Sequence, residues 1–155
     1  MLMQPCSLFD EILSKYKKYG QFSYKPFENL DEKCNASDNQ AGVYLIFCGI
    51  DGCENLLYLG SSGQRSKNGT LKVRQGGMWD RIVNGYHPNK FGEIKRIQRK
   101  KAFPKQMIKE GIKEIIIYWW VTMDNENHDF PTDVEKRLRE NYKAKYGRLP
   151  DWHNQ

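Results

Sequence analysis

The stretch GVYLIFCGIDGCENLLYLG at residues 42–60 predicts two short strands joined by a hairpin. Its first half is rich in the β-branched and aromatic residues that strands prefer. An aspartate–glycine pair in the middle is a strong turn signal. The hairpin is expected to bring Tyr44 and Tyr58 close together. The second strand leads into a run of small residues, 60–63, where a backbone can approach a ligand closely.

The composition is that of one folded domain with a basic surface. At 155 residues, with 39% hydrophobic and 13% aromatic content, the chain suits a single domain and not a disordered one. The net charge of +6 is compatible with an anionic partner. No run approaches the ~20 apolar residues that cross a bilayer, and the N-terminus lacks a signal-peptide pattern. We therefore expect a cytoplasmic protein without a membrane partner.

The four cysteines form no Cys-x-x-Cys pair, which is the spacing expected of a zinc site. Cys48 and Cys53 flank the hairpin turn and could approach each other. In a cytosolic chain, however, free buried thiols are the expectation, because disulfides are rare in that compartment.

Beyond the hairpin, helical spacing and end signals predict several helices and one further strand. Helices are expected at residues 7–18, 78–84, 92–101 and 131–146. Pro104 should break or restart the helix 92–101, and one or two further helical turns should then end at residue 110. The nearly apolar run 115–122 predicts a central strand. Loops are expected at 21–40 and 61–77, and the tail should fold back on the domain through Trp152.

The tripeptides GVY at residues 42–44 and YLG at 58–60 resemble the paired motifs of the GIY-YIG nucleases, with valine and leucine in place of two isoleucines. The resemblance implies an α+β fold: a small three-stranded mixed or antiparallel sheet flanked by helices, in the order β-β-α-α-β-α, with an extra N-terminal helix. The single domain 1–155 would then comprise an N-terminal helix and loop extension (1–40) and a nuclease-like part (41–155).

The same resemblance implies a metal-dependent DNA endonuclease that hydrolyses phosphodiester bonds. This reaction needs a base to activate water, a cation on the phosphate and a means to stabilise the leaving oxygen. The motif tyrosines are Tyr44 and Tyr58, either of which could be the base. A phenol with a pKa of about 10 needs help from positive charge or metal-bound water. Lys72, with Arg74 as alternative, matches a loop lysine of the restriction-type members. Without the motif context, both tyrosines would be assigned to sheet packing.

Arg81 matches the family's helix arginine, which contacts the attacked phosphate. It follows the second motif at a longer distance than in many members, so residues 64–77 resemble an inserted loop. The alternative is a surface arginine paired with Asp80 or Glu93. Members often place a histidine or tyrosine one turn after this arginine, where this chain has a glycine. Tyr86 and His87 follow that glycine and could reach in if the helix ends there. His87 is the candidate auxiliary base, although a lone histidine is more often structural.

Glu135 matches the family's metal-binding glutamate at the start of the final helix. A single carboxylate with several waters suits Mg²⁺ or Mn²⁺. The local sequence also fits a capping box, in which Glu135 would bond back to the amide of Thr132.

Basic residues gather in two groups that could follow a DNA backbone or simply form solvated surfaces. Candidate DNA contacts are Arg74, Lys95, Arg96, Arg99, Lys100 and Asn154, the last as the counterpart of a late asparagine in the family. Double-stranded DNA is the expected partner, and a homodimer is one way to recognise it without a separate module, as in small standalone restriction enzymes. The alternatives are a non-catalytic nucleic-acid-binding module of the same fold and a structure-specific DNA repair nuclease.

Overall fold

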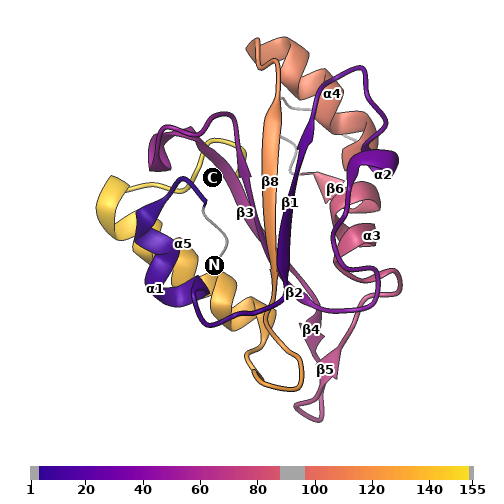
Figure 1. Cartoon of the computed structure of the whole chain (residues 1–155), viewed down its shortest axis with the longest axis vertical. Helices are drawn as coiled ribbons and strands as arrows, with labels where there is room; N and C mark the ends of the chain where they lie inside the picture. The colour runs from indigo at the N-terminus through magenta and orange to yellow at the C-terminus, as the bar shows by residue number, and fades with distance from the viewer. Residues whose placement is uncertain (1–3, 88–96, 154–155) are drawn as a thin grey trace.

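A four-stranded antiparallel sheet lies at the centre of this α+β fold, in the order β1-β8-β2-β3 (Figure 1). The computed structural model describes residues 4–87 and 97–153. The four strands are β1 (Tyr19–Tyr24), β2 (Gly42–Phe47), β3 (Leu56–Ser62) and β8 (Ile115–Val121). The predicted hairpin β2–β3 is confirmed, and β8 is central, as its apolar sequence indicates.

Strand β1 lies partly where the sequence predicts a loop, so the sheet has four strands and the expected three-stranded sheet is wrong. Along β1, Phe22 and Tyr24 are buried whereas Gln21 is exposed, which is the alternation of a half-covered strand. Gly20 belongs to this strand and does not end a helix. A Cβ on Gly20 would lie 2.6 Å from Cζ2 of Trp119 on the neighbouring strand, so the absence of a side chain lets the indole pack there.

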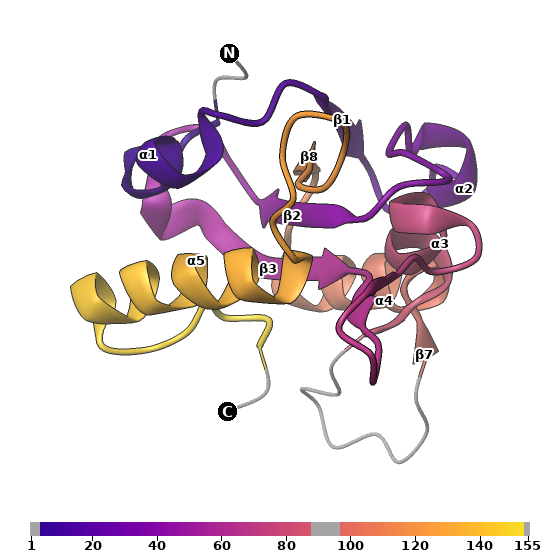
Figure 2. The same ribbon diagram turned by 90° about the horizontal axis from the view of Figure 1, so that it is seen from below.

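Helices cover both faces of the sheet (Figures 1 and 2). One face carries α1 (Asp10–Leu13) and α5 (Pro131–Tyr146), and the other carries α2 (Leu30–Lys33), α3 (Gly77–Asn84) and α4 (Arg99–Glu110). The remaining short elements are η1 (Ser7–Phe9), η2 (Cys53–Asn55), β4 (Gln64–Arg65), β5 (Leu71–Lys72), β6 (Tyr86–His87) and β7 (Ile97–Gln98). Within the described residues, no helix has the length and apolar character needed to cross a bilayer.

Helices α3 and α5 confirm their predictions, whereas two other helices differ from theirs. The helix expected over residues 7–18 is reduced to η1 and the single turn of α1. In the helix expected over 92–101, residues 97 and 98 form β7, and α4 begins only at Arg99. Helix α4 then continues through Pro104 without the expected break. Phe103 and Met107 on either side of the proline are fully buried, and this packing outweighs the local preference.

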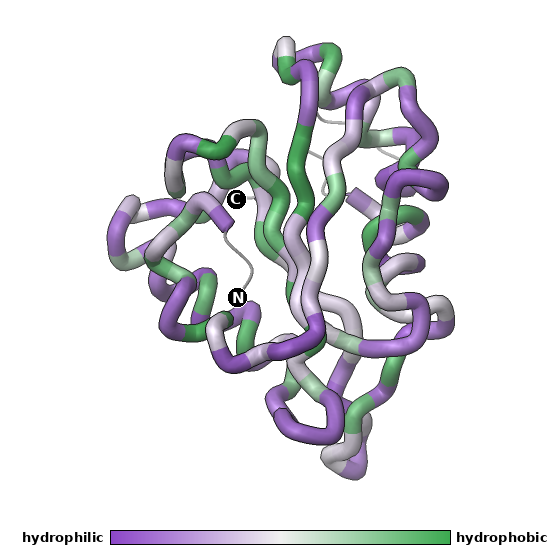
Figure 3. Tube along the Cα trace, in the orientation of Figure 1, coloured by the Kyte–Doolittle hydropathy of each residue, from purple (hydrophilic) through white to green (hydrophobic). Residues whose placement is uncertain are grey.

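Two apolar cores lie on the two faces of the sheet. One contains both motif tyrosines with side chains of α3 and α4, and the other contains side chains of α1 and α5. In Figure 3 the hydrophobic colour marks the end of β8 that carries its isoleucine run, and the aromatic part of the strand is paler. Trp152 is fully buried in the first core, so the tail folds back as predicted.

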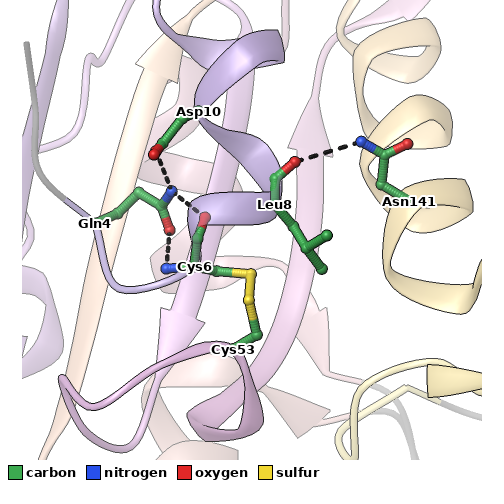
Figure 4. Close-up of a disulfide and its surroundings, with 6 residues drawn as sticks. All are labelled: Gln4, Cys6, Leu8, Asp10, Cys53 and Asn141. Atoms are coloured by element: carbon green, nitrogen blue, oxygen red, sulfur yellow. Dashed lines mark hydrogen bonds between the residues drawn. A yellow bond between two sulfur atoms is a disulfide. The ribbon is translucent and has the colours of Figure 1, made fainter. Parts of the chain in front are cut away.

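A disulfide joins Cys6 to Cys53 and corrects the expectation that all cysteines are free thiols (Figure 4). It connects the N-terminal segment to η2, in the turn between β2 and β3. Gln4 supports this segment, because its amide accepts from the Cys6 N–H at 2.7 Å and donates to the Cys6 carbonyl at 2.6 Å. The two cysteines are 47 residues apart, so only the tertiary fold brings them together. Cys34 and Cys48 are free.

Candidate active site

The hairpin places the two motif tyrosines on one face of the sheet. Tyr44 lies opposite Gly60 and Tyr58 lies opposite Ile46, so the two rings are diagonal neighbours with centroids 6.1 Å apart. A Cβ on Gly60 would lie 2.6 Å from the Tyr44 hydroxyl. The predicted proximity of the tyrosines is confirmed, and the glycine of the second motif provides the space for the first tyrosine.

Tyr44 is fully buried, and its hydroxyl finds no hydrogen-bond partner within residues 4–87 and 97–153. Burial raises the pKa of this phenol to about 12; the charges of Arg99 and Arg81 oppose the rise, whereas Tyr58 and Glu135 add to it. The phenol is therefore neutral near pH 7. The fold thus brings β2, β3, α3 and α5 close enough for their motif side chains to act on one hydroxyl.

The raised pKa of Tyr44 predicts a loss of stability at alkaline pH. The unfolded phenol ionises near its ordinary pKa of 10.0, and the folded one near about 12, so the folded state favours the neutral form. This contribution is fully present below pH 10 or so and is lost as the pH rises to about 12, which amounts to about 3 kcal/mol. Urea unfolding across this range should show stability falling more steeply in the wild type than in Tyr44→Phe.

The matched control for this titration is Tyr86→Phe, which alters a half-exposed tyrosine. This variant should keep the wild-type dependence on pH. Equal slopes for Tyr44→Phe and the wild type would contradict the assignment of the effect to Tyr44.

A cationic cavity opens at the end of β3, directly after Gly60. Its volume is about 430 Å³, and its wall includes the small residues 61–63, Lys72 of β5, Arg81 of α3 and Thr132 of α5. Among the described residues that line it, none is a carboxylate. Two successive elements, β5 and α3, therefore direct positive charge into one space, which suits an anion such as a phosphate group.

Lys72 reaches this cavity because part of the expected loop 61–77 forms a small hairpin. Strands β4 and β5 pair antiparallel, with Lys72 opposite Gln64. An ion pair between Arg65 and Asp133, at 2.8 Å, connects this hairpin to the first turn of α5. The inserted loop is thus attached to the same helix that carries Glu135.

Arg81 lines the cavity and forms no ion pair within the described parts of the chain, so the alternative pairing with Asp80 is not observed. Asp80 instead lies 2.7 Å from Nε of Arg74 and accepts a hydrogen bond from Asn84 at 2.8 Å. Arg74 also lines the cavity, but its charge is paired at the rim. Lys72 is therefore better placed than Arg74 to contact an anion in the cavity. Glu93 lies outside the described residues.

Glu135 does not form the capping box that its local sequence allows. Helix α5 begins at Pro131 with Phe130 as its N-cap, so Thr132 is already inside the helix. The Glu135 carboxylate lies 2.7 Å from Nε of Arg139, one turn further along, and the Glu135 side chain is 19% exposed. The side chain therefore remains partly accessible from outside the helix.

The carboxylate of Glu135 is the side chain here that could serve as a metal ligand. Within residues 4–87 and 97–153, there is no cluster of three or more His, Cys, Asp or Glu side chains that could hold a metal. This excludes a four-ligand zinc site from the described part of the chain. One carboxylate is enough for Mg²⁺ or Mn²⁺, which keep several waters. One oxygen of Glu135 is already paired with Arg139.

His87 lies in an aromatic cluster of the core, not in the cavity. It is 7% exposed, and its Nε2 forms a hydrogen bond with Oε1 of Gln106. Its ring packs edge-on against Phe103 and Trp152, with centroids 5.2 Å away in both cases. Its contacts are those of a packing residue, and the ring of Tyr58 is 6.2 Å away.

His153 contacts the tyrosine pair directly, although the sequence did not indicate it. Its ring stacks on Tyr58 with centroids 4.3 Å apart, and its Nε2 accepts a hydrogen bond from the Leu59 N–H at 3.1 Å. Burial, and then the charges of Arg139 and Arg99, lower the pKa of His153 to about 3. It is therefore neutral and orients Tyr58. A histidine so close to the chain end looks like part of a frayed tail in sequence.

Apart from Arg74, the predicted DNA-contacting residues divide into three groups. Arg99 is fully buried, so its expected place on an outward basic face is wrong: at the start of α4 its side chain turns inward to the tyrosines. Lys100, the next residue, is exposed. Lys95, Arg96 and Asn154 lie outside the described residues.

Comparisons with known proteins identify no relative of this chain. No protein-family model, no curated protein and no solved structure matches it.

Proposed function

We propose that the chain is a metal-dependent DNA endonuclease of the GIY-YIG type. The observation that carries this proposal is the cavity lined by Lys72 and Arg81 at the end of the tyrosine-bearing hairpin. Thr132 lines the same cavity, and Glu135 follows it by one turn of α5. A phosphate in the cavity would thus lie between two cations, the tyrosine hairpin and the helix that carries the carboxylate.

Each side chain has a role that follows from its chemistry. Arg81 and Lys72 offset the negative charge that increases on the phosphate as water attacks, and the planar guanidinium can contact two oxygens at once. Glu135 holds the metal. When bound, Mg²⁺ or Mn²⁺ stabilises the leaving 3′ oxygen.

The two phenols orient the attacking water, and either of them can be the base. Tyr58 is 6% exposed and is held by the stacked His153. Tyr44 is fully buried and neutral near pH 7, so it acts as a hydrogen-bonding phenol unless its proton is removed.

Double-stranded DNA is the substrate that suits the surface around the cavity. The exposed lysines of α4, at positions 100, 101 and 105, lie on a helix that packs beside α3 and can contact neighbouring phosphates. The chain has no separate DNA-binding module in its described residues, and recognition of DNA by the catalytic domain itself is compatible with a homodimer, as in small restriction enzymes.

Cleavage of a supercoiled plasmid tests the proposal. With Mg²⁺ the wild-type protein should produce nicked and linear DNA, and EDTA should stop the reaction. If the protein binds DNA but does not cleave it with Mg²⁺ or Mn²⁺, the nuclease proposal is overturned in favour of a non-catalytic nucleic-acid-binding module. The buried, neutral Tyr44 is the observation that favours this alternative. Cleavage of branched DNA in preference to any duplex sequence would identify a structure-specific repair nuclease instead.

A further inference from the structure

Arg99 is a fully buried cation that faces both motif tyrosines. Its guanidinium carbon lies 5.3 Å from the ring centroid of Tyr44 and 5.1 Å from that of Tyr58. Cations at this distance from an aromatic face are attracted to it, and more strongly when both groups are removed from water. Arg99 therefore contacts the tyrosine pair from the core side, whereas Arg81 lines the open cavity.

The same residue also joins the helix of Arg81 to the start of α4. The Arg99 backbone N–H donates to the carbonyl of Gly85 at 2.9 Å, and its Nη1 donates to the carbonyl of Arg81 at 2.8 Å. Both acceptors lie at the C-terminal end of α3, where the helix dipole favours positive charge, and the Arg81 carbonyl also accepts from the Gly85 N–H at 3.1 Å. The position of Arg81 thus depends on Arg99.

The charge of Arg99 has no counterion in the described parts of the chain. Its Nε and Nη2 have no hydrogen-bond partner there, and the same is true of the neighbouring Tyr44 hydroxyl. A buried guanidinium normally pairs with an anion, because removing its hydration is costly. Two unpartnered polar groups of complementary chemistry therefore lie together, a cation and a phenol that becomes an anion when it loses its proton.

We infer that Arg99 is a positioning residue of the tyrosine pair, and that its charge is balanced by the Tyr44 phenolate when the hydroxyl proton passes to solvent hydroxide. Arg99 thereby makes ionisation of Tyr44 less unfavourable than burial alone would leave it. Once ionised, the phenolate can accept a proton from the attacking water. That last step rests on the proposed nuclease function; the pairing of Arg99 with the phenolate does not.

Four side chains act on the ionisation of Tyr44. Arg99 favours the phenolate most strongly and Arg81 favours it less, whereas Tyr58 and Glu135 oppose it. Burial of the phenol opposes it more than any of these. Removing the Arg99 charge should therefore have a larger effect on Tyr44 than removing the charge of Arg81.

The test is to titrate Tyr44 directly. Incorporation of 3-fluorotyrosine at position 44, a more acidic phenol, brings the ionisation into a pH range where the fold persists, and ¹⁹F NMR follows it without substrate. Arg99→Gln should raise the titration midpoint by more than about one pH unit. Arg99→Lys keeps the charge and should restore most of the wild-type midpoint. An unchanged midpoint in Arg99→Gln would overturn the inference.

Two controls separate this inference from folding and from the proposed function. The same label at Tyr16, in the other core, should report no change in either variant. If Arg99→Gln does not fold, Arg99→Met, which removes the charge but keeps a long apolar side chain, takes its place: its midpoint should rise by more than about one pH unit, and an unchanged midpoint overturns the inference. The titration needs no DNA, so a chain that fails to cleave can still pass this test. In a cleaving protein, the pH profile of Arg99→Gln should move upward by a similar amount.

Discussion

Replacing Arg81 by glutamine should reduce the rate of DNA cleavage about a thousandfold, because the cavity loses the fork of donors that stabilises charge on the attacked phosphate. The fold should remain intact, since the Arg81 side chain lines the cavity and forms no ion pair within the described residues. Plasmid cleavage under single-turnover conditions measures the effect, and circular dichroism checks the fold.

The matched control is Arg137→Gln, which removes an exposed arginine from α5 and should leave cleavage nearly unchanged. The cleavage rate of Arg81→Lys should lie between those of Arg81→Gln and Arg137→Gln, because lysine keeps the charge but loses the bidentate geometry. If Arg81→Gln cleaved at the wild-type rate, the cavity would not be the phosphate site.

Replacing Trp152 by alanine should destabilise the protein by about 3–5 kcal/mol, the usual cost of removing a large buried aromatic side chain. Trp152 is fully buried and packs against His87 and Phe103. Its backbone N–H donates to the carbonyl of Leu57, on the outer strand β3, at 2.9 Å. The tail is therefore part of the core despite its place near the chain end, and urea unfolding should show the loss as a lower midpoint.

The comparison for Trp152→Ala is Phe27→Ala, at a position that is 85% exposed. That change should alter the free energy of unfolding by less than about 0.5 kcal/mol. Trp152→Ala should also slow cleavage, because the adjacent His153 would no longer be held against Tyr58. Wild-type stability of Trp152→Ala would show that the tail does not pack as described.

The elements that the sequence predicted well are those with long, regular patterns. The apolar run of β8, the paired strands of the hairpin and the amphipathic α5 each carry enough local signal to be recognised. Strand β1 (YGQFSY) carries little, since it has no β-branched residue and few apolar ones; its pairing with β8 makes it a strand. Tertiary pairing of this kind is not visible in local sequence.

The residues of the candidate site can be separated in the same way, into those that local sequence predicts and those that it does not. Tyr44, Tyr58, Arg81 and Glu135 could be proposed because they follow one another in a recognisable order along the chain. Arg99 and His153 could not, because their relation to the tyrosines depends on burial and on contacts made by distant segments. The Cys6–Cys53 disulfide was missed for the same reason. Basic residues in a run look alike in sequence, and only the fold turns one of them inward.

The most direct test of the central claim compares Glu135→Gln with Glu140→Gln in the plasmid assay. Both changes remove one carboxylate from α5, but Glu140 is exposed and lies five residues beyond the partly buried Glu135. Loss of the proposed metal ligand should reduce Mg²⁺-dependent cleavage about a thousandfold in Glu135→Gln, and Glu140→Gln should cleave like the wild type. Cleavage by Glu135→Gln at the wild-type rate would contradict the account of this site.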